Sequence, residues 1–190
     1  MEVLIAVVLV AVVVLAAGAW MYSRQQRSKK LQENFGPEYE RALRQTDRDK
    51  GQAERELEER QKRVEKLNLR ELTPDERRRF AEAWRQTQAR FVDEPKVAIK
   101  DADALIAEVM QTIGYPMSDF ERRANDISVT HAEVVPHYRA AHAMAERNQT
   151  GQASTEELRQ AFVHYRALFD EMLGATPAAT NGSGNREVKR

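Results

Sequence analysis

The chain lacks cysteine, and it holds only eight glycines and six prolines among its 190 residues. Without cysteine there are no disulfides, no cysteine-ligated zinc, no iron–sulfur clusters and no thiol catalysis. The chain also has no net charge, because 30 basic residues balance 30 acidic ones. This balance argues against a chain-wide nucleic-acid surface, so we predict no nucleic-acid partner. The length fits one modest domain with additional segments.

Common catalytic and nucleotide-binding motifs are also absent from the sequence. No glycine-rich loop precedes a Lys-Ser/Thr pair, no Gly-x-Gly-x-x-Gly follows a strand pattern, and there is no Gly-x-Ser-x-Gly elbow. We therefore predict no catalytic residue and no cofactor. A non-enzymatic role is favoured, with an enzymatic one left open.

The longest apolar feature is a charge-free run over residues 3–22, VLIAVVLVAVVVLAAGAWMY. Twenty helical residues extend roughly 30 Å, the thickness of the hydrocarbon core of a bilayer. Trp20 and Tyr22 close the run, as aromatic side chains do at a membrane interface. We predict a transmembrane anchor over residues 1–23. The alternative is secretion after signal-peptide cleavage near Ala19, although the basic segment typical of signal peptides is missing.

A cluster of basic residues follows this run, whereas only Glu2 and the terminal amine precede it. Positively charged flanks stay in the cytoplasm, so we predict a bacterial inner-membrane protein with its N-terminus outside and its body in the cytoplasm. An extracytoplasmic binding domain is the alternative. The residues predicted to lie at the membrane interface and contact the lipid bilayer are Trp20, Tyr22, Arg24, Arg27, Lys29 and Lys30.

The remaining sequence predicts an all-α fold in which the anchor is followed by a small antiparallel helical bundle. We expect a charged juxtamembrane helical linker over 24–72, the bundle over 73–174 and a disordered tail over 175–190. Residues 53–67 predict a helix with acid-before-base pairs at i,i+4 spacing. Its short heptad-like stripe leaves a homo-oligomer open.

Helix starts and helix faces are predicted by capping and periodicity. Four capping-box patterns begin at Thr73, Ser118, Thr130 and Ser154. Pro136 lies inside a helix predicted from about residue 130 to 147, where it is expected to kink the helix or displace its start. The last helix has the clearest inward face, made of Leu158, Phe162, Tyr165, Phe169 and Met172.

The tripeptide His-Tyr-Arg occurs twice, at 137–139 and at 164–166. The repetition marks either a shared polar groove or unrelated structural roles. The candidate groove residues are Tyr138, Arg139, His142, His164 and Arg166. The histidines lack i,i+3 or i,i+4 spacing along one helix, so we predict no metal site. We expect Asp101, Asp103 and Glu108 on an exposed face, because nothing in the sequence indicates their burial.

Several short phrases along the chain form a distinctive set: FGPEY at 35–39, FVDEP at 91–95, GYP at 114–116, His131 and YRAAH at 138–142. This set resembles an uncharacterised family of bacterial single-pass helical proteins, named as membrane or secreted proteins. The resemblance covers most of residues 20–173. It implies a bacterial source and one N-terminal membrane helix, and it brings no activity and no site residues.

These observations favour a membrane-tethered helical module for interaction or scaffolding, with a protein partner whose identity the sequence does not give. The alternative is a ligand-sensing or enzymatic helical domain that uses the His/Tyr/Arg groove.

Overall fold

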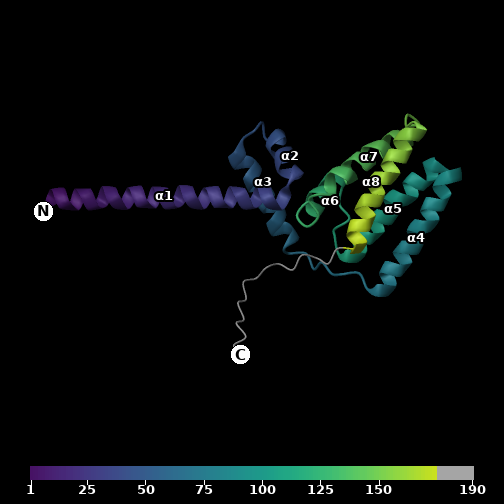
Figure 1. The fold of residues 1–190 in the computed structure, drawn as a ribbon, viewed down its shortest axis with the longest axis horizontal. Helices are drawn as coiled ribbons and strands as arrows, with labels where there is room; N and C mark the ends of the chain where they lie inside the picture. Colours follow the sequence, from purple (N-terminus) through teal and green to yellow (C-terminus); the bar gives the residue numbers. More distant parts are fainter. Residues whose placement is uncertain (175–190) are drawn as a thin grey trace, which may run out of the picture. The chain divides into compact units, whose positions relative to one another are not determined.

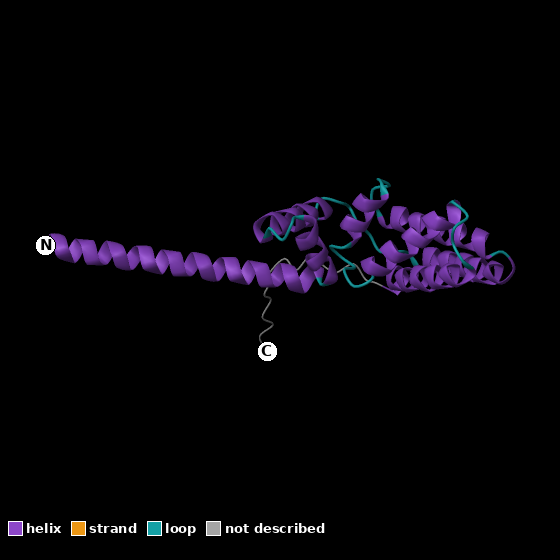
Figure 2. Cartoon of the chain, turned by 90° about the horizontal axis from the view of Figure 1, so that it is seen from above, coloured by secondary structure: helices purple, strands orange, loops and turns teal. Residues whose placement is uncertain are grey.

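The computed structural model describes residues 1–174, except for the side chains of residues 2–11 and 13. The predicted disordered tail, residues 175–190, lies outside this described part. The described residues form eight α-helices and no strand (Figure 2). The predicted all-α class and the helical bundle are therefore confirmed. The chain divides into two compact units, residues 1–59 and 60–190, and each is described by itself.

The first unit contains α1 (Glu2–Phe35), α2 (Pro37–Gln45) and most of α3 (Lys50–Val64) (Figure 1). Gly36 separates α1 from α2 with a positive φ of 44°, and Pro37 takes the first position of α2. The Tyr39 hydroxyl donates a 2.9 Å hydrogen bond to Glu54 Oε1, which joins α2 to α3.

From Glu2 onward, the predicted anchor, residues 1–23, belongs to the continuous backbone of α1. The side chains of residues 2–11 and 13 in this run lie outside the described part. Among the residues that the structure describes, none of the helices contains an apolar stretch sufficient to cross a membrane.

The second unit contains the five remaining helices (Figure 1). They are α4 (Pro74–Asp93), α5 (Pro95–Ile113), α6 (Phe120–Ile127), α7 (Val135–Gln149) and α8 (Thr155–Gly174). The main packing pairs are α4 with α5, α5 with α8 and α7 with α8. One apolar core, running in sequence from Leu72 to Met172, lies among these helices.

Aromatic side chains fill the centre of this core as the periodicity predicts. The Trp84 ring stacks on Phe162 and Phe169, with ring centroids 5.0 and 4.6 Å apart. All five residues predicted for the inner face of the last helix are buried. Offset aromatic pairs at these distances add attraction beyond the burial of apolar area.

Two of the four predicted capping boxes form. Thr73 and Glu76 exchange both hydrogen bonds at the start of α4. The Ser154 and Glu157 side chains make the equivalent pair of contacts before α8. The third box, predicted to begin at Ser118, does not form. The cap of α6 is the next residue, Asp119, whose carboxylate accepts a hydrogen bond from the Arg122 amide. A carboxylate is also a favourable charge at a helix N-terminus.

The predicted start near Thr130 is wrong, because α7 begins at Val135 with Pro136 in its first turn. A proline ring clashes with the carbonyl four residues earlier and provides no amide hydrogen. Pro136 therefore displaces the helix start and does not kink the helix. The Thr130 hydroxyl hydrogen-bonds to the Tyr115 hydroxyl at 2.6 Å instead of capping α7.

The charged helix predicted over 53–67 runs from Lys50 to Val64. It begins three residues early because the Asp49 carboxylate accepts a 2.9 Å hydrogen bond from the Gln52 amide and so caps the first turn.

Candidate functional site

One polar cluster in the second unit joins three helices. It consists of Asp103 from α5, His142 from α7 and Tyr165 from α8, and we call it the Asp103 cluster. The Tyr165 hydroxyl donates a 2.8 Å hydrogen bond to Asp103 Oδ1. His142 Nδ1 lies 4.0 Å from the same oxygen, too far for a direct hydrogen bond. The cluster therefore places one carboxylate between a phenol and an imidazole.

The cluster keeps Asp103 ionised. Burial by itself would raise the pKa of Asp103, but His142 and the Tyr165 hydroxyl outweigh burial and lower that pKa below its ordinary value. The pKa of Tyr165 is raised, first by its burial and then by the Asp103 charge. Tyr165 is thus a permanent hydrogen-bond donor at neutral pH, and it has no capacity to act as a base.

Aromatic packing fixes the imidazole on one side of the cluster. The Phe120 ring stacks on His142 with ring centroids 3.6 Å apart, and it contacts the Tyr138 ring at 4.8 Å. On the other side, His142 Nε2 lies 3.5 Å from Glu146 Oε1. The imidazole is therefore held between two carboxylates, those of Asp103 and Glu146.

Asp103 also borders an open groove of about 520 Å³. The groove lies between α5 and α7 and is lined by Lys100, Asp103, Ala104, Ala145 and Gln149. Its chemistry suits polar recognition, with one carboxylate and one ammonium group on the same helix. The one hydroxyl next to a carboxylate in the cluster is that of Tyr165. Because its pKa is raised, this phenol stays protonated and is not an activated nucleophile.

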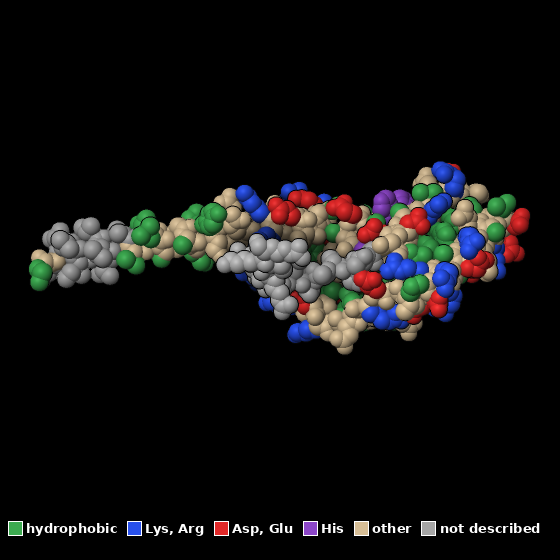
Figure 3. Space-filling view, turned by 60° about the horizontal axis from the view of Figure 1, so that its bottom comes forward, with side chains coloured by type: hydrophobic (Ala, Val, Ile, Leu, Met, Phe, Trp, Pro, Cys, Tyr) green, Lys and Arg blue, Asp and Glu red, His purple; other side chains and the backbone are tan. Residues whose placement is uncertain are grey.

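A second polar cluster is a pair of histidines, His137 from α7 and His164 from α8. Their Nδ1 atoms are 2.8 Å apart, and their ring centroids are 5.0 Å apart. Histidine side chains are visible at the surface in Figure 3. Desolvation, together with the neighbouring His137, lowers the pKa of His164. At 2.8 Å the two Nδ1 atoms are within hydrogen-bond distance, and which of them donates depends on the tautomer of each ring.

The five groove residues predicted from the sequence do not gather in one place. Tyr138 and His142 both contact the Phe120 ring. Arg139 turns to α6, where it contacts Glu121 at 2.6 Å and Asn125 at 2.9 Å. His164 pairs with His137, and Arg166 lies 3.5 Å from Asp170 on its own helix. The repeated tripeptide thus brings its histidines together and separates its arginines.

The sequence reasoning missed Asp103, which it placed on an exposed face with Asp101 and Glu108. Asp101 and Glu108 do form surface ion pairs, with Arg90 and Arg79 respectively. Asp103 lies four residues after Ile99 and three before Ile106, both of them buried. This spacing places Asp103 at the edge of the inner face of α5, and it was the available signal.

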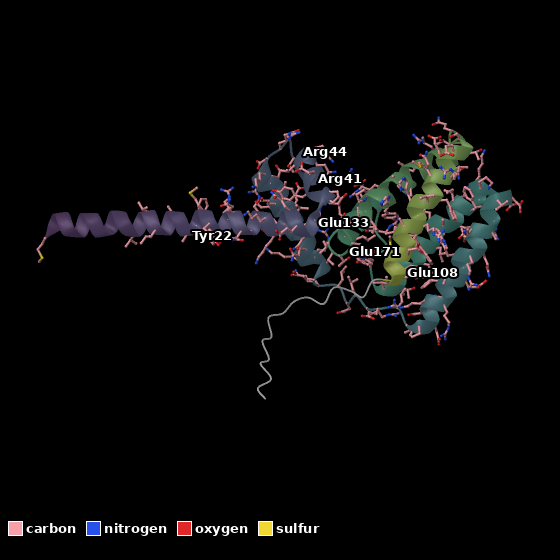
Figure 4. All side chains as sticks on the ribbon, in the orientation of Figure 1. Tyr22, Arg41, Arg44, Glu108, Glu133 and Glu171 are labelled. Carbon is pink, nitrogen blue, oxygen red and sulfur yellow. The ribbon has the colours of Figure 1, made fainter. Side chains whose placement is uncertain are left out.

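The predicted membrane-interface residues lie on the surface of α1. The exposed fractions of Trp20 and Tyr22 are 62% and 65%. The Arg24 guanidinium stands 5.4 Å from the Trp20 ring centroid, and Arg27 pairs with Glu58 of α3. Lys29 and Lys30 are exposed. Figure 4 labels Tyr22 on this helix.

Carboxylates near the remaining histidine do not complete a larger cluster. His131 Nδ1 lies 3.3 Å from Glu171 Oε1, at the end of α8 where Figure 4 labels Glu171. Within the described residues, no group of three or more histidine and acidic side chains is arranged to hold a metal ion.

Comparisons with known proteins leave the function to be argued from this geometry. No protein-family model, no curated protein and no solved structure matches the chain.

Proposed function

We propose that the chain is a membrane-tethered helical module whose body binds a protein partner. The observation that carries the tether is the charge-free run of residues 3–22 within one continuous helix, α1. Such a run is long enough to cross the hydrocarbon core of a bilayer as a helix. Exposed aromatic side chains at Trp20 and Tyr22 support a boundary at the end of this run.

The basic residues that follow give the proposed tether a direction. Arg24, Lys29 and Lys30 are exposed on α1 after the end of the run. They would contact anionic lipid head groups, and each would contribute roughly 1 kcal/mol to membrane binding. The same charges favour a body in the cytoplasm of a bacterium and an N-terminus outside the inner membrane.

The body is proposed as an interaction module because its surface carries both acidic and basic side chains (Figure 3). The arginines of α4 are matched by acids: Arg79 lies 3.2 Å from Glu108, labelled in Figure 4, and Arg90 lies 2.5 Å from Asp101. Paired charges of this kind do not form the unbalanced basic surface that nucleic-acid binding requires. A protein partner is therefore favoured.

The tether is tested by introducing charge into the middle of the run. In the full chain, Val12→Arg together with Val14→Arg should move the protein from the membrane fraction, after an alkaline carbonate wash, to the supernatant. Each arginine near the centre of a spanning helix costs about 2.5–3.5 kcal/mol. The matched control, Val12→Leu with Val14→Leu, should stay in the membrane. Recovery of the unmodified chain in the supernatant would contradict the tether.

The orientation is tested by adding protease to intact spheroplasts. A cytoplasmic body should be cut only after lysis. Cutting before lysis would support the extracytoplasmic binding domain instead, and a mature chain that begins after Ala19 would support secretion.

Crosslinking at native expression levels should capture one reproducible partner or a second copy of the chain, and failure to capture either would contradict the interaction module.

A ligand-sensing role is the second candidate, and the groove beside Asp103 favours it. An ionised carboxylate at the wall of an open groove suits a ligand with an ammonium group. Thermal shift measurements with small primary amines should raise the melting temperature of the full chain but not that of its Asp103→Asn variant. Equal shifts for both proteins would contradict this role.

A further inference from the structure

The two histidines that meet between α7 and α8 have the geometry of a chelating pair. His137 is exposed and His164 is half-buried, so the pair is open to solvent. Their Nδ1 atoms are 2.8 Å apart and belong to two different helices. The packing of α7 against α8 in the bundle holds this distance. Two imidazole nitrogens are thus preorganised at one point of the surface.

This separation matches what a transition metal requires. Zinc binds imidazole nitrogen at about 2.0–2.1 Å, so two nitrogens on one ion stand about 2.9–3.4 Å apart, depending on the angle at the metal. The pair needs to open by only a few tenths of an ångström to admit an ion. Neutral imidazole nitrogen is the form of histidine that binds metal.

The other two histidines of the chain are committed elsewhere. His131 contacts Glu171, and His142 is held between Asp103 and Glu146 under the Phe120 ring. Among the four histidines, all of which lie in the described part of the chain, only His137 and His164 contact each other through nitrogen atoms. Imidazole ligands suit copper, nickel and zinc, whereas magnesium and calcium prefer oxygen.

We infer that His137 and His164 form a surface site for one divalent transition-metal ion, which binds through both Nδ1 atoms and completes its coordination with water. The ion would cross-link α7 to α8. Because it binds only the folded arrangement, it would stabilise the body in proportion to its concentration over its dissociation constant. This site is independent of the proposed tether and of the Asp103 groove.

The test uses the full chain in mild detergent, without a histidine tag, and Cu²⁺ as the probe because copper binds such ligands most tightly in the divalent series. Isothermal titration should give one Cu²⁺ per chain, and electron paramagnetic resonance should show coupling to two imidazole nitrogens. Affinity should fall as the pH is lowered, because protons compete with the metal for the same nitrogens. Mg²⁺ should give no binding.

Variants separate metal binding from a structural hydrogen bond. His164→Asn retains a polar side chain, so its melting temperature should stay close to that of the unmodified chain, while its Cu²⁺ affinity falls at least tenfold and one nitrogen coupling disappears. His131→Ala, the matched control, should bind Cu²⁺ like the unmodified chain. Binding that is unchanged in the His137→Ala/His164→Ala variant would overturn the site.

Discussion

At the residue scale, the informative side chains are charged groups that the fold partly removes from water. Asp103 shares its carboxylate with the Tyr165 hydroxyl at 2.8 Å, and its pKa is lowered. A carboxylate whose pKa is lower in the folded than in the unfolded chain stabilises the fold above its ordinary pKa of about 4. That contribution is lost as the pH falls through the folded pKa.

Tyr165→Phe therefore predicts a stability loss that depends on pH. The variant removes a hydrogen bond to a charged group, so we expect a loss of about 1–2 kcal/mol at pH 7, reduced because Asp103 is partly exposed to solvent. The loss should shrink progressively below pH 4, as the pH falls through the lowered folded pKa of Asp103 and the carboxylate becomes protonated in both states. Urea unfolding at pH 7 and pH 3 measures it.

Tyr115→Phe is the matched control for this prediction. The Tyr115 hydroxyl meets Thr130 Oγ1, an uncharged partner, at 2.6 Å. Its removal should cost a similar amount at both pH values. A Tyr165→Phe loss that is equally independent of pH would show that Asp103 does not supply the stabilisation.

The ion pair between Arg63 and Asp126 gives the second prediction at this scale. The Asp126 side chain is 2% exposed, and it accepts from Arg63 at 2.8 Å, whereas the Arg63 side chain is 34% exposed. Arg63→Ala leaves a buried carboxylate without its cation, so the free energy of unfolding should fall by about 2–3 kcal/mol. Urea unfolding at pH 7 checks this value. Lys62→Ala, an exposed neighbour, should change stability by less than about 0.5 kcal/mol, and an equal effect of the two variants would refute the assignment.

At the element scale, helix identity followed from local patterns, whereas several helix boundaries did not. The inner face of α8 and the cap of α4 are set by residues within a few positions of each other, so the sequence alone predicts them. The start of α7 depends on a competition between the Thr130 cap pattern and Pro136. Steric exclusion by proline costs more than one capping hydrogen bond contributes, and Pro136 therefore decides it.

The end of α5 gives a prediction at this scale. Gly114 closes the helix with φ 113°, and a Cβ atom there would lie 2.9 Å from the backbone oxygen of Asn68. Gly114→Ala should cost about 1–2 kcal/mol for the backbone conformation and about 1–3 kcal/mol more for the clash. Gly151→Ala is the matched control, because Gly151 has φ 73° and open space around it. In thermal unfolding, the melting temperature of Gly114→Ala should be clearly lower than that of Gly151→Ala. Equal decreases in melting temperature would mean that the close approach to Asn68 contributes nothing.

At the scale of the whole molecule, the sequence predicts which segments form the apolar core. It does not predict the contacts that bring two distant segments together. The apolar core from Leu72 to Met172 falls almost entirely within the predicted bundle, because periodic apolar faces imply burial. The Asp103 cluster joins positions up to 62 residues apart, and the histidine pair joins positions 27 apart. No local pattern specifies which residue of one helix faces which residue of another, so these sites required the packed structure.

The division of the chain leads to the last prediction, that residues 60–190 fold without the first unit. Their core closes on itself, with Trp84 stacked between Phe162 and Phe169, and they retain the pair of Arg63 with Asp126. Trp84 is the only tryptophan of this fragment, so its fluorescence reports core packing alone.

We expect cooperative thermal unfolding of the 60–190 fragment, with a midpoint close to that of the same core in the full chain. A fragment of residues 65–190 lacks Arg63 and should melt roughly 5–15 °C lower, as a loss of a few kcal/mol implies for a body of this size. The comparison separates two origins of stability. If both fragments melt together, the Arg63–Asp126 pair contributes nothing to the isolated body. If the longer fragment unfolds without cooperativity, the core depends on residues before 60, and the two compact units are not independent in folding.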